Sequence, residues 1–185
     1  DYEGKKVILV TCHRRENYGQ PMEDIMSALV RIAKSHLDTE LVYPVHLSPV
    51  VQECAHRRLD GIENVHLIAP LDVEEMHNLM ARSYLVMTDS GGLQEEAPAL
   101  GKPVLVLRKE TERPEAVQAG TVKLAGVDYD VITGLADELL DNPEAYREMA
   151  HAVNPYGDGK ACRRIADGIL HHFGRMDRKP EPFNS

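Results

Sequence analysis

Short apolar runs rich in β-branched residues alternate with amphipathic segments along most of the chain, and this alternation constrains the fold most strongly. The predicted strands are Lys6–Thr11, Glu40–Val45, Asn64–Ala69, Tyr84–Thr88, Pro103–Leu107 and Thr121–Leu124. The predicted helices are Pro21–Lys34, Val50–Leu59, Val73–Ala81, Leu93–Leu100, Pro114–Ala119, Tyr129–Asp141, Pro143–Ala152 and Asp158–Phe173. Near-continuous apolar strands separated by helices are typical of a parallel sheet covered on both faces. The sequence therefore predicts an α/β fold with a doubly wound parallel sheet.

The length and composition of the chain indicate one globular domain in a reducing compartment. A chain of 185 residues can bury a substantial core, and a net charge of −9 with a pI of about 5.4 argues against non-specific binding of nucleic acid. Cys12, Cys54 and Cys162 are widely spaced without a CxxC motif, so we expect free thiols in the cytoplasm. An apolar run of bilayer length and a signal-peptide pattern are both absent from the sequence, so we expect no membrane partner.

The two ends of the chain carry separate expectations. The sequence opens at Asp1 without an initiator methionine, which predicts that it is part of a longer polypeptide. We expect one domain over residues 1–173 and a flexible tail over residues 174–185, where Pro180 and Pro182 disfavour regular structure.

The most specific local motif follows the apolar run that ends at Thr88. Ser90, Gly91 and Gly92 precede a helix-forming segment, so the order is strand, small-residue loop and helix. Free backbone N–H groups at such a helix start favour an anion such as a phosphate, and Glu96 one turn later could accept the hydroxyls of a ribose. A tight strand-to-helix turn without a ligand is the alternative interpretation.

Two further polar loops follow predicted strands, at the edge of the sheet where doubly wound folds bind ligands. The loop Thr11–Asn17 contains His13, Arg14 and Arg15, which could bind a diphosphate or, for the histidine, move a proton. The loop Arg108–Glu115 gathers three cations and three carboxylates. A solvated charged loop in the first case, and a self-neutralising loop in the second, are the alternatives.

The remaining chemistry-bearing residues give weaker signals. His46 ends the second predicted strand, where a lone histidine is more often structural than a ligand. The chain has nine histidines but neither HExxH nor another ligand spacing, so we expect no metal site. The motifs GxGxxG, GxxxxGK[ST] and GxSxG are absent, which argues against a nicotinamide cofactor, a Walker loop and a nucleophile elbow.

Five motifs, taken in their order along the chain, resemble those of a known family. T-C-H-R-R-E-N, Y-P-V-H, T-D-S-G-G-L-Q-E-E-A, G-K-P-V-L-V-L-R and T-E-R-P-E-A-V-Q-A-G-T look like the C-terminal half of non-hydrolysing UDP-N-acetylglucosamine 2-epimerases. The resemblance runs from Lys6 to Phe173 and ends with N-P-Y-G-D-G-K-A and the last helix. It implies a Rossmann-like domain that forms one half of a GT-B fold. It also implies a missing N-terminal domain, with the active site in the cleft between the two, and a homodimer of the full-length enzyme.

The resemblance assigns a binding role to several positions. His13 matches the histidine that contacts the substrate in the cleft, and we expect it to be catalytic. Ser90, Gly91 and Gly92 match the diphosphate loop. Glu96 matches the carboxylate that holds the ribose hydroxyls. The arginine of the T-E-R-P-E motif is also assigned to the substrate, and its place is taken here by Arg113.

The resemblance assigns roles to four further positions, whose side chains give these roles less chemical support. Leu71 and Met76 fall where relatives contact the uracil, often through a glutamine and an aromatic ring, so side-chain stacking on the base is in doubt. Arg14 and His46 match positions that, in some bacterial relatives, bind a second UDP-N-acetylglucosamine as an allosteric activator. A regulatory site and an ordinary solvated loop both remain open for this pair.

The implied reaction interconverts UDP-N-acetylglucosamine and UDP-N-acetylmannosamine by anti elimination of UDP and its re-addition. The expected ligands are UDP and a UDP-N-acetylhexosamine, with no redox cofactor and no metal. By resemblance, the carboxylates that act at C2 lie in the missing domain, so the chain alone should be inactive. The alternatives are a hydrolysing UDP-N-acetylglucosamine 2-epimerase, the nucleotide-binding domain of a GT-B glycosyltransferase, and a non-catalytic module that binds nucleotide sugars.

Overall fold

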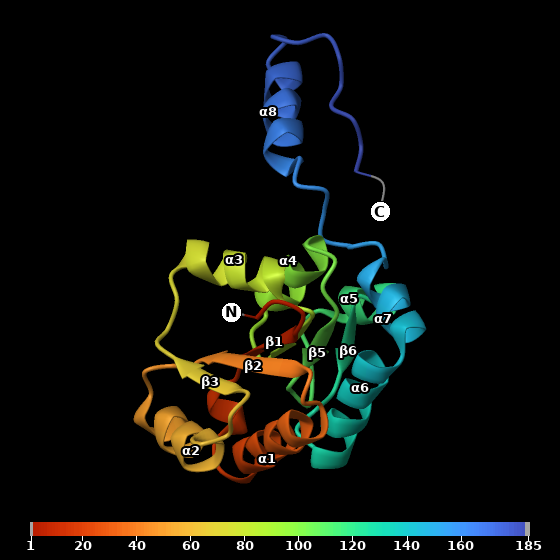
Figure 1. Cartoon of the computed structure of the whole chain (residues 1–185). Coiled ribbons are helices and arrows are strands. Elements are labelled where there is room, and N and C mark those ends of the chain that lie inside the picture. Colours follow the sequence, from red (N-terminus) through yellow and green to blue (C-terminus); the bar gives the residue numbers. More distant parts are fainter. Residues whose placement is uncertain (1, 184–185) are drawn as a thin grey trace.

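A six-stranded parallel sheet forms the centre of the computed structural model, which describes residues 2–183 (Figure 1). The strand order is β3-β2-β1-β4-β5-β6, so the direction of winding reverses between β1 and β4. The strands are β1 (Lys6–Thr11), β2 (Thr39–Pro44), β3 (Val65–Ile68), β4 (Leu85–Thr88), β5 (Val104–Val106) and β6 (Val122–Leu124). The predicted doubly wound parallel sheet is thereby confirmed.

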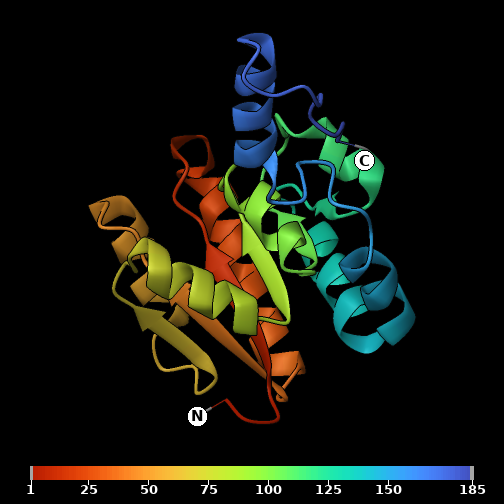
Figure 2. The same ribbon diagram turned by 90° about the horizontal axis from the view of Figure 1, so that it is seen from above.

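Helices cover both faces of this sheet (Figures 1 and 2). One face packs against α1 (Gln20–Ser35), α2 (Pro49–Leu59) and α6 (Tyr129–Asp141). The other packs against α3 (Val73–Arg82), α4 (Leu93–Ala99) and α5 (Pro114–Ala119). A 3-10 turn, η1 (Arg15–Asn17), precedes α1, while α7 (Pro143–Ala150) follows α6. The last helix is α8 (Ala161–His172).

Alternate residues of the central strands supply two separate cores. Ile8 and Val10 of β1 belong to the cluster beneath α1, α2 and α6, whereas Leu9 belongs to the cluster beneath α3, α4 and α5. Met87 and Val86 of β4 divide in the same way. Successive side chains of a strand point to opposite faces, so a strand that is apolar at every position requires cover on both sides. The continuous apolar runs of the sequence are explained by this geometry.

Most element boundaries agree with the sequence prediction to within one or two residues, and the last helix differs most. The prediction starts it at Asp158, but α8 begins at Ala161. Gly157 and Gly159 have φ values of +129° and +75°, which interrupt helical geometry. Asp158 instead accepts a hydrogen bond from the Lys160 amide at 3.1 Å. The turn η1 was not predicted from the sequence.

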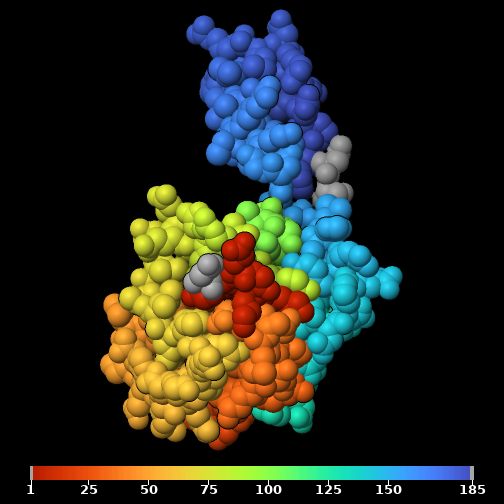
Figure 3. Space-filling model, in the orientation of Figure 1, coloured from red at the N-terminus to blue at the C-terminus, as the bar shows by residue number. Residues whose placement is uncertain are grey.

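The helix α8 and the segment after it stand apart from the body that contains the sheet, as the space-filling view shows (Figure 3). The following chain turns back along α8, where the ring of His171 contacts the carbonyl oxygen of Met176 at 3.0 Å. The predicted flexible tail covers residues 174–185. Its last two residues, and Asp1 at the other end of the chain, lie outside the described residues. Across residues 2–183, no helix has the length and apolarity needed to cross a bilayer.

Candidate functional site

The buried side chain of Asp89 organises the loops at the carboxyl ends of the central strands. It follows β4 directly and is fully buried. Its Oδ2 accepts hydrogen bonds from the amides of His13 and Arg14, both at 2.7 Å, and from Asn17 Nδ2 at 3.2 Å. Asn17 also donates to the carbonyl oxygen of Leu107 at 3.0 Å, just after β5. Three strand ends are therefore joined at the point where the winding of the sheet reverses, which is where such folds bind ligands.

A pocket of about 250 Å³ opens beside this network and collects five of the residues selected from the sequence. They are His13, His46, Leu71, Met76 and Ser90, and the other lining residues are Thr11, Pro44, Pro70 and Leu93. The rings of His13 and His46 are stacked, with centroids 5.1 Å apart and an interplanar angle of 7°. The wall is thus apolar on the side of Leu71 and Met76 and polar on the side of the histidines and Ser90.

Gly91 follows Ser90 of this pocket and lies among three charged side chains. A Cβ atom placed on Gly91 would lie 3.4 Å from Glu112 Oε1, 3.8 Å from Arg14 Nη2 and 3.9 Å from Arg113 Nη2. Two guanidinium groups and one carboxylate, which is the nearest of the three, therefore surround this position. Guanidinium groups are well suited to binding an anion with paired oxygens, such as a phosphate. The helix α4 that follows has only seven residues, so its dipole adds little.

The cations of the third loop are partly neutralised by neighbouring carboxylates. Arg113 donates to Glu95 through Nε, and this hydrogen bond raises the pKa of the guanidinium. Arg108 donates to Glu16 at 2.7 Å and also pairs with Glu112. The loop is therefore self-neutralising through these pairs, and Arg113 Nη2 also lies 3.9 Å from the position of a Cβ atom on Gly91.

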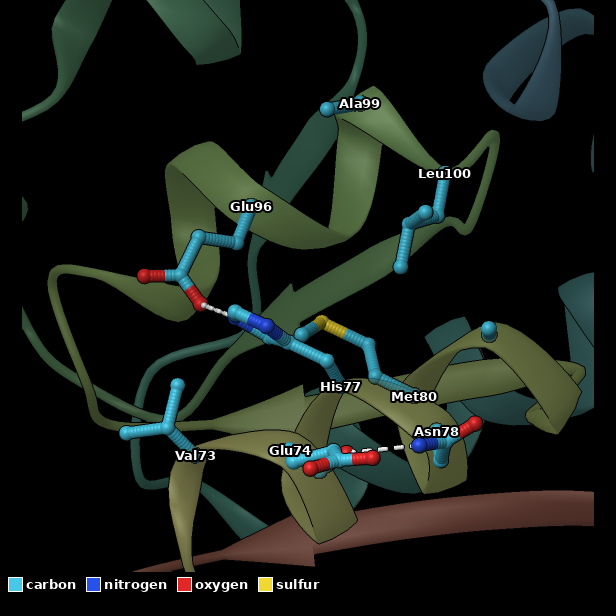
Figure 4. Close-up of a pocket in the computed structure, with 9 residues that line it drawn as sticks. Val73, Glu74, His77, Asn78, Met80, Glu96, Ala99 and Leu100 are labelled. Atoms are coloured by element: carbon cyan, nitrogen blue, oxygen red, sulfur yellow. Dashed lines mark hydrogen bonds and ion pairs between the residues drawn. The ribbon is translucent and has the colours of Figure 1, made fainter.

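Glu96 lies in a different hollow, between α3 and α4, with a volume of about 740 Å³ (Figure 4). Its Oε2 lies 3.0 Å from Nε2 of His77, and both side chains are about half exposed. Its Oε1 lies 3.4 Å from the position of a Cβ atom on Gly92, so the carboxylate sits over the small-residue loop. The structure places Glu96 at the edge of the loop rather than in the pocket of His13.

Sequence reasoning missed three residues of this region, namely Asp89, Asn17 and His77. Asp89 stood in the motif T-D-S-G-G without a role, although a carboxylate directly after a fully apolar strand is a detectable signal. Asn17 and His77 gave no signal, because their partners lie 72 and 19 residues away along the chain. Within residues 2–183, no three His, Cys, Asp or Glu side chains gather in a way that could hold a metal ion.

The fold and the site define a Rossmann-like α/β domain whose ligand edge presents cations and a half-apolar pocket. A sequence model of the family UDP-N-acetylglucosamine 2-epimerase matches residues 1–170, and the chain belongs to this family.

Individual relatives agree with the family assignment. The UDP-N-acetylglucosamine 2-epimerase of Bacillus subtilis is 54% identical over 178 residues, which cover 96% of this chain and 47% of that protein. The structure of Staphylococcus aureus MnaA with UDP has a TM-score of 0.93 and 48% identity, and the match covers 99% of this chain and 50% of MnaA. For the UDP-GlcNAc 2-epimerase of Neisseria meningitidis bound to UDP-GlcNAc, the TM-score is 0.86 and the identity 46%, covering 91% of this chain and 45% of that one.

The chain spans about half the length of the curated relatives it matches, and it aligns with one half of the solved enzymes. A glycosyltransferase, Escherichia coli heptosyltransferase WaaC with ADP, shares the fold at a TM-score of 0.56 and 17% identity. The fold of the chain is therefore also that of one half of a GT-B glycosyltransferase.

Proposed function

We propose that the chain is the UDP-sugar-binding half of an enzyme that interconverts UDP-N-acetylglucosamine and UDP-N-acetylmannosamine without releasing the free sugar. The observation that carries this proposal is the pocket at the reversal of the sheet, with the guanidinium groups of Arg14 and Arg113 around Gly91. The relatives with UDP or UDP-GlcNAc bound support the choice of nucleotide.

Each part of the ligand has a matching surface in this proposal. The diphosphate lies over Ser90, Gly91 and Gly92, where Arg113 exchanges its bond to Glu95 for a phosphate oxygen. Glu96 at the edge of the loop accepts the ribose hydroxyls, because its carboxylate already lies beside Gly92. The base lies at the apolar end of the pocket, against Leu71 and Met76.

The chemistry follows from how this half holds the leaving group. Elimination removes the C2 proton and breaks the bond between C1 and the diphosphate oxygen, giving a 2-acetamidoglucal and UDP. Fixed cations and backbone donors stabilise the charge that collects on the leaving diphosphate, and they hold UDP for re-addition. His13 contacts the substrate from this side, while the groups that act at C2 belong to the missing half.

The second half of the enzyme is an essential partner in this proposal. A site closed from two sides orients the substrate and excludes water, which one wall alone does not do. Arg14 and His46, whose ring stacks on that of His13, are also suited to a second UDP-N-acetylglucosamine that acts as an allosteric activator.

Titration calorimetry of the purified chain with UDP tests this proposal. We expect the chain to bind UDP and to show no epimerase activity by itself. Replacing Arg113 by glutamine should weaken UDP binding about tenfold, because a charge-assisted hydrogen bond is lost. Arg163→Gln on α8 is the matched control, since this side chain is 77% exposed and distant from the site. Turnover without a second polypeptide, or failure to bind UDP, would contradict the proposal.

A further inference from the structure

One oxygen of the buried Asp89 carboxylate has no ordinary hydrogen-bond partner. Its Oδ2 is satisfied by two backbone amides and by Asn17, whereas Oδ1 accepts no hydrogen bond among the described residues. A buried carboxylate oxygen in this state is costly unless a donor lies against it. The imidazole of His13 lies beside it, with Nδ1 3.4 Å from Oδ1, although this contact does not have the geometry of a hydrogen bond.

The protonation of His13 Nδ1 decides whether this contact is attractive. A bare Nδ1 would set its lone pair against that of a buried carboxylate oxygen, and this arrangement is unfavourable. A proton on Nδ1 instead places a partial positive charge beside Oδ1 and makes the contact attractive. The thiol of Cys12 also lies near the carboxylate, and burial, reinforced by Asp89, raises the pKa of Cys12 and keeps its proton in place.

We propose that Asp89 is a positioning residue that fixes the ring proton of His13 on Nδ1 and thereby leaves Nε2 as a hydrogen-bond acceptor for a ligand. The side chain of His13 is 35% exposed while Asp89 is fully buried, so the exposed part of the ring lies away from the carboxylate. That part lines the pocket with Ser90 and His46. A histidine held in one tautomer by a buried carboxylate presents a defined acceptor, which suits it to receive a proton or a hydroxyl hydrogen bond.

The neighbouring His46 provides an internal comparison. The backbone amide of Ser48 donates to Nδ1 of His46 at 3.0 Å, so this nitrogen carries no proton and the neutral ring is protonated at Nε2. The two stacked rings are therefore expected to hold opposite tautomers. Only the catalytic meaning of the His13 tautomer rests on the proposed function, because the tautomer itself is measured without any nucleotide.

Long-range ¹H–¹⁵N correlation spectra of the nucleotide-free chain test the inference, at a pH where both rings are neutral. The pattern of cross peaks between ring protons and ring nitrogens distinguishes the two tautomers, and the variants His13→Gln and His46→Gln assign the signals. We expect a predominantly Nδ1–H ring for His13 and a predominantly Nε2–H ring for His46. A predominantly Nε2–H ring for His13 in the unaltered chain would overturn the proposal.

The variant Asp89→Asn tests the role of the carboxylate itself. The amide oxygen can replace Oδ2 as the acceptor for the two backbone amides, and the NH₂ group then faces His13 as a donor. We expect this change to shift His13 to a predominantly Nε2–H ring. Asn17→Ala is the matched control, because it removes a donor from the same carboxylate but leaves Oδ1 beside the ring, and the tautomer should not change.

An unchanged Nδ1–H ring in folded Asp89→Asn would show that Asp89 does not set the tautomer. A shift that also occurs in Asn17→Ala would assign the effect to general loosening of the loop and would equally refute the proposal. If Asp89→Asn does not fold, the spectrum of the unaltered chain still decides. Loss of UDP binding with the expected tautomers would count against the proposed function alone.

Discussion

At the scale of single residues, two of the proposed ligand-binding side chains are paired with exposed neighbours, and a ligand can replace these neighbours at a small cost in free energy. Arg113 is paired with Glu95, and Glu96 with His77, and these four side chains are between 31% and 51% exposed. An exposed ion pair such as that of Arg113 with Glu95 contributes between about 0 and 1 kcal/mol, and the hydrogen bond between Glu96 and His77 is similarly exposed. A phosphate or a ribose can therefore replace a protein partner at small cost. The fully buried Asp89 is of a different kind, because its bonds fix the loops themselves.

The assignment of Glu96 to the ribose can be tested by comparing two ligands. We expect Glu96→Ala to weaken UDP binding about tenfold and to leave inorganic pyrophosphate binding nearly unchanged, because pyrophosphate has no ribose hydroxyls. Calorimetry with each ligand measures the difference. His77→Ala removes the present partner of Glu96 and should keep UDP affinity within about threefold of the parent. Equal losses of both ligands in Glu96→Ala would show that the ribose assignment is wrong.

At the scale of elements, the sequence predicted strands best where consecutive residues are buried. The strands β1, β4 and β5 were predicted closely because each is buried and apolar at most positions, which a doubly covered sheet explains. The site was predictable as a set of loops, since parallel strands end at one edge. The hydrogen-bond network within the site was not predictable from the sequence. Asp89 and its donors are 72 to 76 residues apart, so they leave no local periodicity.

Asp137 links two helices that are distant in the sequence, and its contribution to stability depends on pH. It lies on α6 and accepts hydrogen bonds from Arg31 of α1 and from His36 Nε2, the latter at 2.7 Å. Burial alone would raise the pKa of Asp137, but the bonds from Arg31 and His36 outweigh it and lower the pKa. A lowered folded-state pKa stabilises the fold above the unfolded value of about 3.9, and this contribution disappears as the pH falls through the folded value.

We therefore expect Asp137→Asn to reduce the free energy of unfolding by about 1 kcal/mol at pH 7. The difference from the parent chain should shrink as the pH falls below about 4. Urea denaturation at a series of pH values measures it. Asp177→Asn is the matched control, because this carboxylate is exposed in the segment after α8 and should show no difference at any pH. A gap between Asp137→Asn and the parent that is constant with pH would refute the role of the carboxylate charge.

At the scale of the whole molecule, the chain consists of a well-packed body and a separate lobe made by α8 and the segment that follows (Figures 1 and 3). Among the described residues, none on α8 is buried, and Ile165, Ile169 and Phe173 are 62%, 54% and 71% exposed. Both sheet faces are covered without this helix. The lobe therefore adds little to the stability of the body within this chain.

This division predicts the effect of removing the lobe. A chain that ends at Gly159 keeps Tyr156, which packs against the core beneath α3, α4 and α5, and loses α8 entirely. We expect its body to unfold within about 2–4 °C of the parent, which corresponds to less than about 1 kcal/mol, because no core contact is removed. Thermal unfolding followed by circular dichroism measures this shift. The matched comparison is Ile132→Ala on α6, whose fully buried side chain leaves a cavity, and that change should lower the free energy of unfolding by about 2–5 kcal/mol. A truncated chain as unstable as Ile132→Ala would show that α8 is part of the cooperative fold rather than an appended lobe.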